Sequence, residues 1–74
     1  MKFNGQYLEQ LRLAQGWSRA KLVAKLYRHS FYLGEGAIFK IERGLRQPRQ
    51  VDFLVEKLAK IFGVKKEGFF KSEP

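Results

Sequence analysis

Residues 38–49 read Ile-Phe-Lys-Ile-Glu-Arg-Gly-Leu-Arg-Gln-Pro-Arg, and this stretch decides how the chain is interpreted. Ile38 and Ile41 lie three residues apart, so they share one face of a helix. Gly44 ends that helix, because glycine readily adopts the left-handed conformation of helix C-termini. Pro48 prevents the same helix from resuming. The stretch therefore predicts a short helix followed by a turn.

Basic residues surround the end of this helix. Arg43, Arg46 and Arg49 are spaced regularly through the turn, where they could contact the backbone of a polyanion. The chain has a net charge of +8, and residues 19–49 contain eight basic side chains against two acidic ones. Nucleic acid is the commonest reason for such a bias, and a solvated, solubilising surface is the alternative.

The length and composition limit the kind of protein this can be. With 74 residues the chain is expected to form one domain, residues 1–74, with a small core. Hydrophobic residues make up 45% of it, which favours a compact fold over a disordered one. There is no cysteine, so disulfides and thiolate metal sites are excluded. Without a signal peptide or an apolar run of about 18 residues, we expect a cytoplasmic protein and no membrane partner.

Apolar residues recur at helical spacing along most of the chain. Asn4 and Ser18 are suitable N-caps for two helices, and Gly16 and Gly63 are suitable stops. Pro48 suits the first position of a further helix. The expected helices cover residues 5–15, 18–28, 35–43 and 48–62, with one more short helix or turn around residues 64–70. No strand alternation is visible, so the sequence predicts an all-α, compact five-helix bundle.

A set of these residues is similar to a known family. The set is Leu11-Arg12, Gly16-Trp17-Ser18, Leu22, Leu26, Ile38, Ile41-Glu42-Arg43-Gly44, Pro48 and residues 58–64. Together they resemble the phage-repressor-like helix-turn-helix family, of the lambda repressor and Cro type, over residues 5–70. The resemblance implies a DNA-binding domain whose second and third helices form the motif, with the third helix in the major groove.

The resemblance also implies roles for individual residues. It implies a structural ion pair between Arg12 and Glu42, so we interpret Glu42 as structural rather than catalytic. The expected base contacts are Glu35, Gly36, Phe39 and Lys40. The expected phosphate contacts are Arg19, Arg43, Arg46 and Arg49.

The sequence departs from the family pattern between the second and third helices. The segment from Leu26 to Ile38 is longer than usual, and Tyr27 stands where glycine is expected. Gly36 and Ala37 at the start of the third helix offer no side-chain hydrogen bond to a base. We therefore expect weak base reading, or base reading assisted by His29, Ser30 or Tyr32. Phosphate affinity is unaffected, because it rests on the arginines.

Two functions remain open at this point. The first is a sequence-specific DNA-binding transcriptional regulator, a repressor that binds double-stranded DNA as a homodimer. The alternative is an antitoxin or another protein-interaction module with the same fold, a protein partner and weak DNA binding. An enzyme is not expected, because no serine has an adjacent base and orienting acid, and the carboxylates are scattered. The lone histidine gives no metal site, and no cofactor is implied.

Overall fold

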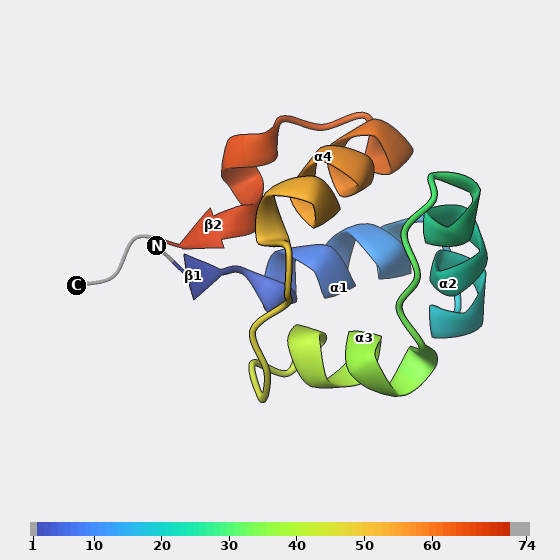
Figure 1. Cartoon of the computed structure of the whole chain (residues 1–74), viewed down its shortest axis with the longest axis horizontal. Helices are drawn as coiled ribbons and strands as arrows, with labels where there is room; N and C mark the ends of the chain where they lie inside the picture. Colours follow the sequence, from blue (N-terminus) through green and yellow to red (C-terminus); the bar gives the residue numbers. More distant parts are fainter. Residues whose placement is uncertain (1, 72–74) are drawn as a thin grey trace.

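The computed structural model describes residues 2–71. It contains four α-helices, α1 to α4, and a two-stranded sheet (Figure 1). A single 3₁₀ helix, η1, lies between α4 and the second strand. In chain order the elements are β1 (Lys2–Phe3), α1 (Gly5–Ala14), α2 (Arg19–Arg28), α3 (Glu35–Glu42), α4 (Val51–Phe62), η1 (Lys66–Phe69) and β2 (Phe70–Lys71).

Local signals determine where α1 and α2 begin. The side chain of Asn4 accepts a hydrogen bond from the backbone N–H of Tyr7 at 3.2 Å, and Ser18 accepts one from Lys21 at 3.1 Å. Each cap satisfies one of the backbone donors that the first helical turn leaves unpaired. Both N-caps are therefore at the predicted residues.

The start of α4 differs from the prediction. The helix begins at Val51, three residues after Pro48. Gln50 adopts a left-handed conformation with φ 50°, which a helix continuing from Pro48 would not tolerate. The proline therefore belongs to the loop between α3 and α4. The predicted end at Gly63 is correct, because that residue is the left-handed C-cap.

The prediction of a five-helix bundle is wrong. The expected fifth helix is only the four-residue 3₁₀ helix η1, and the two ends of the described chain pair as antiparallel strands. Phe3 faces Phe70 in this pairing, and the ring of Phe3 stacks on that of Phe69 with centroids 6.0 Å apart. Strands of two residues are too short to show alternation, so they leave no periodic signal in the sequence.

The core lies where the four helices meet. In Figure 1, α1 crosses the middle of the molecule with α4 on one side and α3 on the other. Gly5 lies directly against the backbone carbonyl of Ile41, so α1 and α3 approach closely there. This close approach fixes α3 against α1. The buried apolar residues are Phe3, Leu8, Leu22, Leu26, Ile38, Ile41, Leu54, Val55, Leu58 and Phe69.

Candidate nucleic-acid interface

The inner face of α3 attaches this helix to the rest of the domain. Ile38 and Ile41 are buried in the core, as their spacing predicted. Glu42 is also buried, and an isolated charge in that environment would be strongly unfavourable. The partners of Glu42 therefore determine whether α3 can pack in this way.

Arg12 on α1 is the principal partner of Glu42. Its Nε donates to Glu42 Oε2 at 2.7 Å, and its Nη2 donates to Oε1 at 3.2 Å. Nη1 of the same guanidinium donates to the backbone carbonyl of Trp17 at 2.7 Å. The ion pair that the resemblance implied is therefore present. Its two-point geometry joins α1, the turn before α2 and the C-terminal end of α3.

Arg19 lies in the same cluster. Its Nε donates to Glu42 Oε1 at 2.9 Å, and 28% of its side chain is exposed. The resemblance implied a phosphate contact for Arg19, and its side chain here is bound to a carboxylate of its own domain. Arg19 is thus partly available to solvent and partly engaged.

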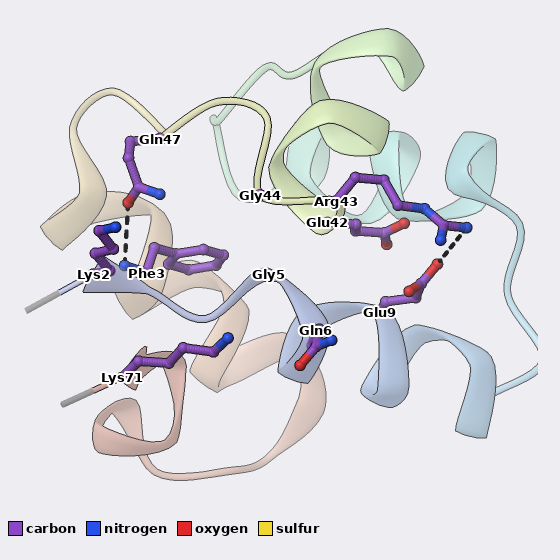
Figure 2. Close-up of a pocket in the computed structure, with 10 residues that line it drawn as sticks. All are labelled: Lys2, Phe3, Gly5, Gln6, Glu9, Glu42, Arg43, Gly44, Gln47 and Lys71. Atoms are coloured by element: carbon purple, nitrogen blue, oxygen red, sulfur yellow. Dashed lines mark hydrogen bonds and ion pairs between the residues drawn. The ribbon is translucent and has the colours of Figure 1, made fainter. Parts of the chain in front are cut away.

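Glu9 on α1 is the residue of this cluster that sequence reasoning missed. One of its carboxylate oxygens, Oε2, lies 3.4 Å from Arg43 Nη2 and 3.6 Å from Arg19 Nη2. Figure 2 shows Arg43 extending from the end of α3 towards Glu9. The i,i+3 spacing of Glu9 and Arg12 was a signal for one ion pair, at 3.9 Å. Nothing in the sequence linked Glu9 to the other two arginines.

The outer face of α3 carries all four predicted base contacts. Glu35, Gly36 and Lys40 are exposed, and Phe39 is 42% exposed. Glu35 and Phe39 lie four positions apart, as do Gly36 and Lys40, so the four residues cover one side of the helix. This side faces away from the core.

Phe39 is flanked by two guanidinium groups. The Cζ atom of Arg19 is 4.9 Å from the centroid of its ring, and that of Arg43 is 5.7 Å away. Both distances fall within the range of cation–π attraction. Two of the expected phosphate contacts therefore adjoin the outer face of α3.

Arg46 and Arg49 lie in the loop between α3 and α4 and are exposed. Within residues 2–71 neither forms an ion pair or a side-chain hydrogen bond. They line a cleft of about 360 Å³, together with part of the α2–α3 connection. Tyr32, in that connection, is exposed. The other lining residues are Phe31, Leu33, Ile41, Pro48 and Gln50.

A second, polar groove of about 410 Å³ lies between the paired chain ends and the end of α3 (Figure 2). Gln47 crosses one end of it, and its Oε1 accepts a hydrogen bond from the backbone N–H of Phe3 at 3.2 Å. Glu9 and Arg43 lie at the other end. This groove therefore ends at the Glu9 cluster.

The described residues also limit other kinds of site. Across residues 2–71, no three His, Cys, Asp or Glu side chains are grouped as a metal site would require. In the same part of the chain, no helix has the length and apolar character needed to cross a lipid bilayer.

No family model, curated protein or solved structure matches this chain.

Proposed function

We propose that the protein is a sequence-specific DNA-binding transcriptional regulator that places the outer face of α3 in the major groove. It would act as a repressor by occluding its site, as a homodimer on a two-fold symmetric sequence. The observation that carries this proposal is the two-sided character of α3. One side is attached to α1 and α2 through buried groups. The other side is exposed, carries Lys40 and adjoins Arg43.

The charges around α3 support the same proposal. Arg46 and Arg49 continue the basic surface beyond the end of the helix, and the whole chain carries a net charge of +8. Contacts to phosphates determine the register and orientation of a protein on duplex DNA, and base contacts from the groove add sequence preference. The exposed residues of α3 provide few hydrogen-bonding groups, so phosphate contacts would supply most of the affinity.

The test begins with selection of bound sites from random duplex DNA at two salt concentrations. A palindromic consensus is expected. Binding to the selected site is then measured over a range of salt for the wild type, Arg46→Ala and Arg49→Ala. Each substitution should make the slope of log K against log salt shallower by about one unit, because each removes one phosphate contact.

Lys65→Ala is the matched control for these arginine variants. Lys65 is exposed, carries the same charge and directly precedes η1. The segment between α4 and β2, which contains η1, lies on the far side of α1 from α3 (Figure 1). Its loss should leave the slope nearly unchanged. An unchanged slope for both arginine variants, or an equal fall for Lys65→Ala, would contradict the proposed phosphate contacts. A selection without a consensus would contradict sequence-specific regulation.

A protein-interaction module, such as an antitoxin, is the second candidate. It is favoured by large apolar side chains that are exposed in the structure, because such groups often mark contact with another protein. They are Leu13, Tyr27, Tyr32, Phe39, Leu45 and Phe53. A selection that yields no consensus, together with a weak and sequence-independent DNA affinity, would favour this candidate over the first.

A further inference from the structure

We infer that Glu9 limits DNA affinity, because its carboxylate competes with DNA phosphate for Arg19 and Arg43. This inference rests on the proposed function. Glu9 would hold the two arginines in the free domain and release them when α3 is seated in a matching groove. The inference follows from differences between the two carboxylates of the cluster.

Glu42 is a permanent partner. Its side chain is fully buried, and it accepts hydrogen bonds from Arg12 and Arg19 at 2.7 to 3.2 Å. Arg12 also donates to the carbonyl of Trp17, so all its three nitrogens are engaged. DNA cannot reach the Glu42 carboxylate or the Arg12 guanidinium without opening the core.

Glu9 is a weaker partner. Its side chain is 20% exposed, and its closest ion-pair contacts with Arg43 and Arg19 are 3.4 and 3.6 Å. Charge-assisted hydrogen bonds are normally about 2.7–2.9 Å long, so these contacts are loose. The Arg43 side chain is 54% exposed, and a phosphate oxygen could approach it at hydrogen-bonding distance. A phosphate can therefore replace the Glu9 carboxylate at Arg43 and, to a lesser degree, at Arg19.

Phe39 keeps both arginines near α3 when they leave Glu9. Their Cζ atoms lie 4.9 and 5.7 Å from its ring centroid, and this attraction does not depend on Glu9. Released guanidinium groups would therefore remain beside the outer face of the helix. On DNA that α3 does not fit, the phosphates lie farther away, and Glu9 retains the arginines. The carboxylate therefore weakens binding most at the matching site, where the arginines have to leave it.

The test compares Glu9→Gln with Glu56→Gln. Both remove one negative charge, but Glu56 lies on α4 and pairs with Lys60 at 3.8 Å. Affinity is measured for the selected site and for an unrelated duplex of equal length. Glu9→Gln should raise affinity for the selected site by about threefold to fivefold, the equivalent of one partly exposed ion pair, and raise it less for the unrelated duplex. Glu56→Gln should change both affinities by one small, equal factor.

The salt dependence gives a second measurement. In the wild type, a carboxylate that loses its arginines takes up a cation from solution, and this partly offsets the cations released by DNA. Glu9→Gln cannot do so, and its slope for the selected site should be steeper by up to about one unit. Glu9→Asp keeps the charge, but its shorter side chain withdraws that charge from Arg43. Its affinities should therefore resemble those of Glu9→Gln.

A double-mutant cycle with Arg43→Gln isolates the contact, once circular dichroism and urea unfolding show each variant folded. Adding Glu9→Gln to Arg43→Gln should have a smaller effect on DNA affinity than adding it to the wild type. If Glu9→Gln is not folded, Glu9→Asp replaces it in the same cycle.

Three results would overturn the inference. They are equal effects of the Glu9 substitution in both backgrounds, equal effects of Glu9→Gln and Glu56→Gln, or a lower affinity of Glu9→Gln for both duplexes. In each case a selected consensus and an arginine-dependent salt slope would leave the proposed function standing. The proposed function fails separately, through the absence of that consensus in the wild type.

Discussion

The two faces of α3 differ in almost every property although the helix has only eight residues. On the inner face Ile38 and Ile41 are buried, whereas Phe39 and Lys40, which lie between them in the sequence, are exposed. The inner face makes contacts within the domain that hold the helix in one orientation. The outer face has few contacts of its own and leaves its side chains available to another molecule.

The same division separates the charges. The buried carboxylate of Glu42 is neutralised by Arg12 and Arg19, and no buried side-chain nitrogen or oxygen among residues 2–71 lacks a hydrogen-bond partner. Lys40, on the outer face, forms no ion pair within those residues. A charged group that packing does not require is free to serve binding. Under the proposed function, stability and recognition therefore depend on different sides of one helix, and substitutions should separate them.

Glu42→Gln tests the inner face and should have the largest effect on stability. The substitution keeps the shape of the side chain but removes the buried counter-charge of the Arg12 guanidinium, whose only remaining carboxylate among residues 2–71, Glu9, lies 3.9 Å away. Removing one member of a buried pair typically costs about 3–5 kcal/mol. A loss of that size approaches the whole stability of a small domain. It is measured by urea unfolding followed by circular dichroism.

Glu56→Gln serves as the control for this measurement as well. Its contact with Lys60 is exposed, so its loss should change the free energy of unfolding by less than about 1 kcal/mol. If Glu42→Gln costs no more than this control, the orientation of α3 depends on apolar packing alone. The ion pair would then contribute nothing to the difference between the two faces.

Much of the fold, including the inner face of α3, was predictable from the sequence, because it depends on local signals. The caps at Asn4 and Ser18 and the stop at Gly63 act within a few residues of their own helices, and the structure has all three in place. The apolar spacing of Ile38 and Ile41 identified the buried side of α3 in the same way. The pairing of Arg12 with Glu42 came from the family resemblance rather than from spacing.

Two of the three features that were missed depend on contacts between distant residues, and the third depends on the backbone at one position. The strands form because Phe3 and Phe70 are brought together at opposite ends of the chain, and two residues show no period. Pro48 carries the signal of a helix start, but the left-handed backbone at Gln50 postpones the helix to Val51. Glu9 meets Arg43 across 34 positions of the sequence, a contact that only folding reveals.

Gly5→Ala tests the inner face through backbone packing, and Gly36→Ala is its counterpart on the outer face. A Cβ atom at Gly5 would collide with the backbone carbonyl of Ile41, which no side-chain rotation can relieve. We expect a loss of about 1–3 kcal/mol, as for other overpacked sites. At Gly36 a Cβ would meet no atom within 4 Å, so alanine should stabilise α3 by about 0.5 kcal/mol.

A fall in the free energy of unfolding for Gly5→Ala and a rise for Gly36→Ala, measured in urea, would support the difference between the two faces. A neutral Gly5→Ala would show that α1 can move away from α3 at little cost. The attachment of α3 would then be looser than the contact between Gly5 and Ile41 indicates.

Lys40→Ala tests the outer face and should have the smallest effect on stability, within about 0.5 kcal/mol in urea unfolding. Its effect should appear on DNA instead. If Lys40 reaches guanine O6 or N7, its loss should relax preference at one base pair of the selected site, at a cost of about 1–3 kcal/mol. An equal loss on all sequences would make Lys40 a further phosphate contact, because such contacts carry no sequence information directly. A marked loss of stability would break the comparison itself, because the outer face would then also hold the fold together.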